Sequence, residues 1–177
     1  MSWQTQLRGD SVSWLLKSDS PNIRYLAMRD LLDISPNGKK LKAARKSAHR
    51  EGPIAVVLSK MEEEGYWVKA GPGYNPKYRS TVWCMILLAQ LGASVAEDKR
   101  VGQACQYLLD HALVDGGKFT STTSGAPSGT IDCLQGNLVW SLMKLGCDDP
   151  RLDSAYEWMA RTLTGEGFLC VDGRVIY

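Results

Sequence analysis

The chain has 177 residues, of which 44% are hydrophobic and 23% are charged, a composition typical of a folded globular domain and unlike that of a disordered chain. A formal net charge of +2 is too small to indicate nucleic-acid binding by itself. No apolar run is long enough to span a membrane, and the polar N-terminus lacks the apolar segment of a secretory signal, so we expect a cytoplasmic protein without a membrane span.

The first third of the chain predicts two or more helices. Ser20-Pro21 is typical of a helix start, and the segment that follows places Ile23, Leu26, Ala27 and Leu31 on one helical face. A basic helix over residues 39–50 comes next and breaks at Gly52-Pro53. It could meet an acidic partner or a phosphate backbone, but it has no interleaved aromatic residues. We therefore favour a solvated surface and expect no nucleic-acid partner.

A repeat of about 50 residues organises the rest of the chain. Gly65, Gly117 and Gly167 each follow a helical segment and precede an aromatic or apolar pair, at offsets of 52 and 50 residues. Gly92 and Gly146, which are 54 residues apart, each follow a leucine and fit the left-handed position that ends a helix. Asp149-Pro150 is a further predicted helix start.

Each repeat contains two kinds of helix. One kind has a one-sided apolar stripe and is expected to be half exposed. Its residues are Val101, Ala104, Cys105 and Leu108 in one repeat, and Leu152, Ala155, Tyr156 and Met159 in the next. The other kind, over residues 82–91, is apolar nearly all round and must be buried on most sides.

These patterns predict an essentially all-α fold of about eight helices, and no segment shows the alternation typical of a strand. We expect a single helical domain over residues 1–177, with divergent N-terminal helices over 1–52 and two to three repeats over 53–177. The cysteines are odd in number and widely spaced, which favours reduced packing residues over a disulfide framework. They are Cys84, Cys105, Cys133, Cys147 and Cys170.

The turns "GYW", "GGKF" and "GEGF", set between an outer helix and a buried "STVWCMILLAQLG"-type helix, resemble the prenyltransferase and squalene-cyclase repeat over residues 53–169. That resemblance implies an α/α toroid, in which inner helices form a barrel and outer helices surround it. The chain offers too few helix pairs to close a toroid, so we expect a partial or open barrel. Self-association into a homo-oligomer, or membership of a larger chain, would then complete it.

The chain departs from this family at the catalytic motifs. The D-x-D-D motif with which the terpene cyclases protonate their substrate is missing, so cyclase activity is not expected. The protein prenyltransferases bind zinc with an Asp, a Cys one residue beyond it and a distant His. Here Asp132 and Cys133 are adjacent, and neither His49 nor His111 lies where the family's ligand would be.

The loop between residues 71 and 78 leads into the first inner helix, at the barrel end where the family keeps its active sites. The repeat alignment places "TIDCLQGN" (130–137) at the same rim. Ligand sites combine aromatic walls with a few polar groups, which these segments supply. The candidate ligand-binding residues are Trp67, Tyr74, Tyr78, Arg79, Trp83, Asp132, Cys133 and Asn137. The structural alternative is that the aromatic residues only pack the loop against its neighbours.

Zinc is a second hypothesis for the same rim, with Asp132, Cys133 and Cys170 as candidate ligands. The structural alternative is a helix-capping Asp and a packed Cys. The ligand-site and zinc-site hypotheses each imply a function. We expect a repeat protein that binds an apolar or isoprenoid-like ligand on its inner face, without cyclase activity. The alternatives are a zinc-dependent, prenyltransferase-like enzyme and a protein-interaction scaffold.

Overall fold

The computed structural model describes residues 3–32, 34–124, 129–166, 169–171 and 174–176. Its elements are the 3-10 helix η1 (Trp3–Gln6), α1 (Ser11–Leu16), α2 (Pro21–Leu31), α3 (Lys39–Arg50), α4 (Pro53–Leu58), α5 (Thr81–Gln90), α6 (Lys99–Ala112), β1 (Leu113–Val114), β2 (Lys118–Phe119), α7 (Asp132–Leu145), α8 (Arg151–Thr164), β3 (Leu169–Val171) and β4 (Arg174–Ile176). The described residues thus contain eight α-helices, which confirms the prediction of a mainly helical chain.

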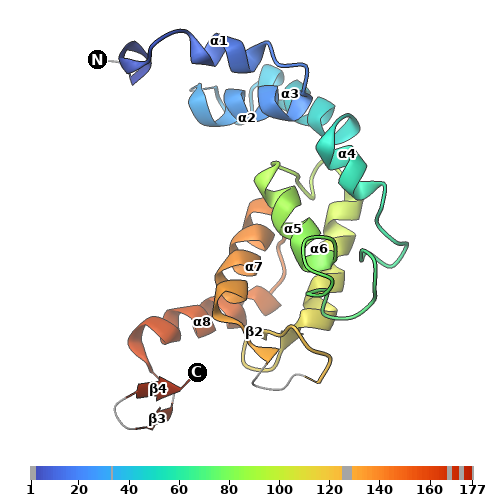
Figure 1. Ribbon diagram of the computed structural model, residues 1–177, viewed down its shortest axis with the longest axis vertical. Helices are drawn as coiled ribbons and strands as arrows, with labels where there is room; N and C mark the ends of the chain where they lie inside the picture. The colour runs from blue at the N-terminus through green and yellow to red at the C-terminus, as the bar shows by residue number, and fades with distance from the viewer. Residues whose placement is uncertain (1–2, 33, 125–128, 167–168, 172–173, 177) are drawn as a thin grey trace.

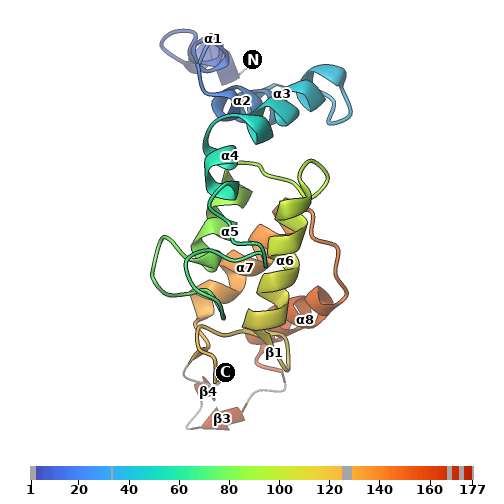
Figure 2. The same ribbon diagram turned by 90° about the vertical axis from the view of Figure 1, so that its right-hand side faces the viewer.

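The helices form an elongated row. Helices α1–α3 lie at one end, α4 leads away from them, and α5–α8 form the body at the other end (Figure 1). Helices α5 and α7 pack along each other, with α6 beside α5 and α8 beside α7 (Figure 1, Figure 2). No helix in the described part of the chain is long and apolar enough to cross a membrane.

Helices α5 and α7 end in the same way. Gly92 and Gly146 have φ values of +80° and +81°, which a residue with a side chain rarely adopts. In both helices the residue after the glycine donates its backbone N–H to the carbonyl five residues earlier, at 2.9 and 3.0 Å. This pairing satisfies carbonyl groups at the end of the helix and confirms the predicted glycine ends.

Helices α6 and α8 begin in the same way. The Asp98 carboxylate accepts the backbone N–H of Arg100 at 2.9 Å and pairs with its guanidinium at 2.6 Å. Asp149 accepts the N–H of Arg151 at 2.9 Å and pairs with its guanidinium at 2.9 Å. The side-chain hydrogen bond from Arg151 is the main reason that the pKa of Asp149 lies below its usual value. Helix α8 begins at Arg151 with Pro150 in the capping position, one residue later than the predicted start with Asp149 as the cap and Pro150 as the first helical residue.

The turns at Gly65 and Gly117, called Gly turns below, pack against the helices that follow them, α6 and α8. A Cβ on Gly65 would lie 3.0 Å from the carbonyl oxygen of Gln103 on α6. A Cβ on Gly117 would lie 2.0 Å from the carbonyl oxygen of Ser154 on α8. Gln103 and Ser154 are 51 residues apart, so this contact recurs at the spacing found in the sequence.

Some side chains of the basic helix α3 make contacts within the fold. Its Arg45 pairs with Glu97 at 2.6 Å, and the His49 Nε2 accepts the backbone N–H of Ser94 at 3.0 Å. These contacts join the N-terminal helices to the loop after α5. Its exposed residues include Lys39, Lys40, Lys42, Lys46 and Arg50.

Two short β-hairpins accompany the helices of this essentially all-α chain. Leu113 pairs with Phe119 across β1 and β2, and β3 pairs with β4 in the same antiparallel sense. The first hairpin turns through Gly116 and Gly117, both at φ +81°, a left-handed conformation that suits tight antiparallel turns. Strands this short show no alternation of apolar and polar residues, so no periodicity revealed them.

The predicted apolar stripes are confirmed on α6 and only partly elsewhere. Val101, Ala104, Cys105 and Leu108 are all buried. On α8, however, Tyr156 is 38% exposed, because Trp158 points inward instead. On α2, Ile23 is 41% exposed. It lines a hollow between α1 and α2 rather than a packed contact.

Candidate functional site

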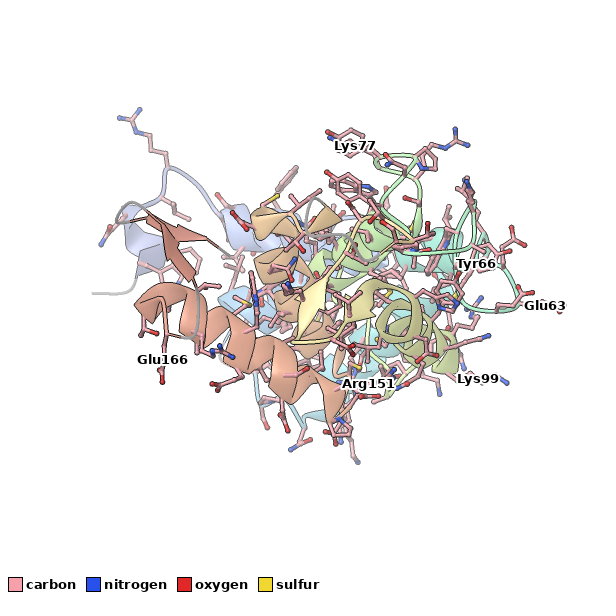
Figure 3. The ribbon with its side chains drawn as sticks, turned by 90° about the horizontal axis from the view of Figure 1, so that it is seen from below. Glu63, Tyr66, Lys77, Lys99, Arg151 and Glu166 are labelled. Atoms are coloured by element: carbon pink, nitrogen blue, oxygen red, sulfur yellow. The ribbon has the colours of Figure 1, made fainter. Side chains whose placement is uncertain are left out.

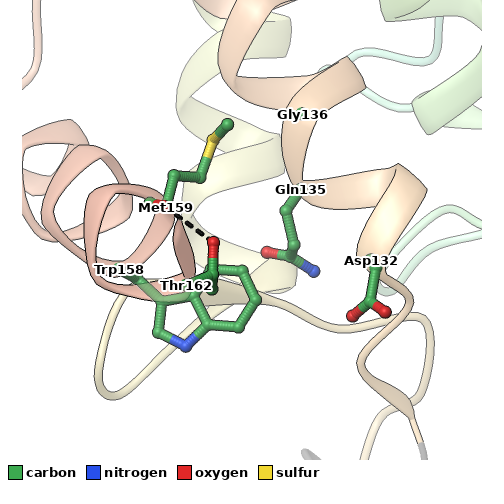
Figure 4. Close-up of a pocket in the computed structure, with 6 residues that line it drawn as sticks. All are labelled: Asp132, Gln135, Gly136, Trp158, Met159 and Thr162. Carbon is green, nitrogen blue, oxygen red and sulfur yellow. Dashed lines mark hydrogen bonds between the residues drawn. The ribbon is translucent and has the colours of Figure 1, made fainter. Parts of the chain in front are cut away.

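A pocket of about 290 Å³ lies between the first turns of α7 and the C-terminal half of α8 (Figure 4). It is lined by Asp132, Gln135, Gly136, Trp158, Met159 and Thr162. Gly136 leaves room in this space, because a Cβ there would meet only the Met159 methyl carbon, at 4.0 Å. The pocket therefore joins an apolar wall to three polar side chains.

Gln135 builds the α7 side of the pocket. Its side chain is buried, with Oε1 accepting the N–H of Phe119 at 2.6 Å and Nε2 donating to the Phe119 carbonyl at 2.8 Å. Phe119 is itself fully buried, so its two backbone groups depend on such partners. Gln135 thereby fixes the strand β2 against α7.

The preceding repeat has a matching contact. The Thr81 Oγ1 accepts the backbone N–H of Trp67 at 3.2 Å. Thr81 and Gln135 are 54 residues apart, the same spacing as the two helix-ending glycines. In both repeats a buried polar side chain at the start of an inner helix thus accepts the N–H of the aromatic residue that follows the Gly turn.

The two repeats differ in what fills the adjacent space. Between α5 and α6, main chain occupies it: Gly71 donates its N–H to the Tyr107 hydroxyl at 2.8 Å. A Cβ on Gly73 would lie only 2.6 Å from the Cβ of Thr81. Trp158 on α8 occupies the repeat position of Tyr107 on α6. Beside Trp158 the described residues do not fill the space, and a pocket remains.

The Asp132 carboxylate can receive hydrogen bonds from a ligand in the pocket. Asp132 is the first residue of α7 and is exposed, with Ile131 rather than Asp132 in the capping position. Its carboxylate makes no hydrogen bond or ion pair with the described part of the chain. The Thr162 hydroxyl donates to the Met159 carbonyl at 2.7 Å (Figure 4).

Three of the predicted aromatic residues form a cluster at the start of α5. The Trp83 ring lies 5.5 Å from the Tyr74 ring and 4.9 Å from the Tyr78 ring. The Trp83 indole N–H donates to the Tyr74 carbonyl at 2.8 Å, and the Lys77 ammonium lies 5.6 Å from the Tyr74 ring centre. Tyr78 is 78% exposed, whereas Tyr74 and Trp83 are half-buried and pack against the core. Arg79, next to Tyr78 in the chain, is exposed too.

Trp67 lies apart from that cluster. It is buried, and its indole N–H donates to the Val57 carbonyl at 2.8 Å. Its backbone N–H is bound to Thr81, so both of these donors serve the packing of the first Gly turn.

An apolar stripe remains uncovered along α5 and α7. Leu87 is 42% exposed on α5, and Trp140 and Met143 are 40% and 54% exposed on α7. Cys133 and Asn137 are exposed on the same helix α7, and the Asn137 amide donates to the Cys133 carbonyl at 2.8 Å. Large apolar side chains in adjacent exposed positions are typical of binding surfaces.

The zinc hypothesis gains no support from the geometry. Over the described ranges, no three His, Cys, Asp or Glu side chains gather closely enough to hold a metal ion. The Cys170 side chain lies outside the description. The ring nitrogens of His49 bind backbone groups of Arg45 and Ser94, so this histidine is a packing residue.

The cysteines should differ in reactivity. Burial raises the pKa of Cys84 to about 11, whereas Cys133 is exposed. The thiolate is the reactive form, and only about 0.1% of a thiol with that pKa is ionised at pH 8. We expect iodoacetamide to label Cys133 at least about tenfold faster than Cys84 in the native protein, with the rates converging in urea. Peptide mass spectrometry measures both rates, and equal native rates would contradict this burial.

Of the predicted residues, only Asp132 lines the α7–α8 pocket. The other lining residues were not predicted as site residues; they are Gln135, Gly136, Trp158, Met159 and Thr162. One signal could have identified Gln135: it is polar, it lies in an apolar inner helix, and it occupies the repeat position of Thr81. The α8 residues gave no such signal, because Trp158, Met159 and Thr162 read as an ordinary outer helix.

Comparison with known proteins adds no further assignment. No model of a known family, no curated protein and no solved structure matches the chain.

Proposed function

We propose that the chain binds a small apolar ligand of isoprenoid type in the pocket between α7 and α8. The observation that carries this proposal is the pocket itself, in which Trp158, Met159 and Gly136 provide apolar surface beside the Asp132 carboxylate. Pockets that combine apolar walls with a few polar groups are the usual sites for small molecules. The resemblance of the repeats to the prenyltransferase and squalene-cyclase family favours an isoprenoid over other apolar ligands.

The size of the pocket limits the ligand. A volume of about 290 Å³ lies at the lower end of the range for small-molecule sites, about 300–1,000 Å³. One or two isoprene units fit such a space, and a triterpene does not. The Asp132 carboxylate favours a ligand with a hydroxyl or ammonium head group, since it accepts hydrogen bonds.

The proposed activity is binding rather than cyclisation. General-acid catalysis needs a carboxyl group that is positioned and tuned to give up its proton. Among the described residues, Asp132 is the only carboxylate that lines this pocket, and it is exposed. No D-x-D-D motif occurs in the sequence.

Filling the pocket should abolish binding. In the Gly136→Leu variant the new side chain occupies the space beside Met159, and we expect affinity for geraniol to fall at least about thirtyfold, equivalent to about 2 kcal/mol of lost burial. Isothermal titration calorimetry measures the affinity. Stability should not fall, because leucine is a better helix former than glycine by about 0.8 kcal/mol.

The control is Gly102→Leu. Gly102 is also a helical glycine whose Cβ would make its nearest contact at 4.0 Å, but it lies on α6. Equal loss of geraniol binding in both variants, or no binding by the unaltered protein, would contradict the proposal.

The apolar stripe of α5 and α7 supports a second candidate, in which a second copy of the chain or another protein docks on Leu87, Trp140 and Met143. The Gly136→Leu variant separates the two candidates. A helix that docks on this stripe does not enter the α7–α8 pocket, so the variant should leave docking unchanged.

A further inference from the structure

A second pocket, of about 440 Å³, lies between the first Gly turn and the exposed side of α6. Its lining residues are Glu64, Tyr66, Ala70, Gln103, Gln106, Tyr107, Asp110 and His111. Figure 3 shows Tyr66 next to α6, with Glu63 further from the body of the protein. This pocket is separate from the α7–α8 pocket and shares none of its residues.

Three rings form one wall. The Tyr107 ring lies 5.2 Å from the Tyr66 ring and stacks on the His111 ring at 3.9 Å. Tyr107 is buried and its hydroxyl accepts the N–H of Gly71, so it holds this wall in place. A stacked wall of this kind offers flat, electron-rich surface to a planar cation.

Two carboxylates, from Glu64 and Asp110, line the pocket together with the His111 imidazole. Among the described residues, no Lys or Arg lines it. Asp110 already pairs with Arg151 at 2.5 Å, and the Arg151 guanidinium also donates to Gln106 Oε1 at 2.7 Å. The α6 surface thus already binds one guanidinium through a carboxylate and an amide oxygen.

Glu64 is the carboxylate that remains for a ligand. It is exposed, and no ion pair links it to the described part of the chain. Gln103 donates its side-chain N–H to the Glu63 carbonyl, so its Oε1 remains an acceptor beside the Tyr66 hydroxyl and the Glu64 carboxylate. Of these three acceptors, only Glu64 carries a charge. An unneutralised carboxylate beside an aromatic wall favours a cationic ligand.

We propose that this pocket binds a guanidinium group, with the planar cation stacked along Tyr66 and paired with the Glu64 carboxylate. A guanidinium suits the site better than an ammonium because it is flat enough to stack on a ring and offers parallel N–H groups to one carboxylate. The chemistry fits an arginine side chain of a peptide as well as a free small guanidine.

The test uses methylguanidinium as the probe and N-methylurea as its neutral planar counterpart. Ligand-observed NMR titration of the full chain should give saturable binding of methylguanidinium and none of N-methylurea. In Glu64→Gln the affinity for methylguanidinium should fall about tenfold, which corresponds to one lost charge-assisted pair. Glu63→Gln removes the same charge from a neighbouring residue outside the pocket and should change the affinity less than twofold.

Equal losses in the two glutamate variants would overturn the proposal, because the effect would then be general electrostatics. Binding of N-methylurea as strong as that of methylguanidinium would overturn it too. A capped Gly-Arg-Gly peptide that binds at least tenfold tighter than methylguanidinium would identify a peptide arginine as the source, and equal affinity would identify a free guanidine. Gly136→Leu should leave all of these affinities unchanged, so this site and the isoprenoid pocket can fail independently.

Discussion

Replacing Gly117 by alanine is expected to destabilise the protein by about 3–4 kcal/mol, which lies in the range of a severe backbone conflict. The new Cβ would lie 2.0 Å from the carbonyl oxygen of Ser154, so the turn or helix α8 must move. The left-handed φ of +81° adds about 1–2 kcal/mol for any residue with a side chain. Urea unfolding followed by circular dichroism measures the change.

Gly116→Ala is the matched control for this prediction. Gly116 has the same φ of +81°, but a Cβ there would meet nothing within 4 Å. It should therefore show only the backbone cost, about 1–2 kcal/mol. Equal destabilisation by the two variants would show that the Gly117 turn does not rest against α8.

Replacing Gln135 by leucine should destabilise the protein by about 3 kcal/mol, because it leaves the buried N–H and C=O of Phe119 without this partner at about 1–3 kcal/mol for each group. For a chain of this length that loss lowers the melting temperature by about 6–12 °C. Differential scanning calorimetry measures the shift.

Asn137→Leu makes the same amide-to-leucine change one helical half-turn further on. The Asn137 side chain is exposed and bonds only within its own helix, to the Cys133 carbonyl. We expect a change below about 0.5 kcal/mol, as for most surface substitutions. A melting temperature unaffected by Gln135→Leu would mean that the bonds to Phe119 contribute nothing to the fold.

Helix boundaries could be predicted from the sequence where a residue type has a single local structural role. Gly92 and Gly146 mark helix ends because few other residues adopt a left-handed conformation cheaply, and Asp149 marks a helix start because a carboxylate binds free N–H groups there. The β1–β2 hairpin escaped prediction, since its form depends on two adjacent glycines and strands too short for any periodicity.

The candidate site was predicted less well, because pockets depend on which residues fail to fill a space. The repeat alignment directed attention to the start of α7 and to Asp132, which lines the pocket. It could not show that Gly71 and Gly73 fill the equivalent space one repeat earlier. Nor could it show that Trp158 and Met159 face Gly136, because the direction of a side chain on α8 depends on tertiary packing and cannot be read from the sequence.

The most direct test of isoprenoid binding is an NMR titration of geraniol into protein labelled with carbon-13 at its methionine methyl groups. The chain has six methionines, and only Met159 lines the α7–α8 pocket. Binding in this pocket predicts a saturable shift of the Met159 methyl signal, with Met61 and the fully buried Met85 unchanged. A shift confined to Met143 would place the ligand on the exposed stripe instead, and no shift at Met159 at saturating geraniol would contradict the proposed function.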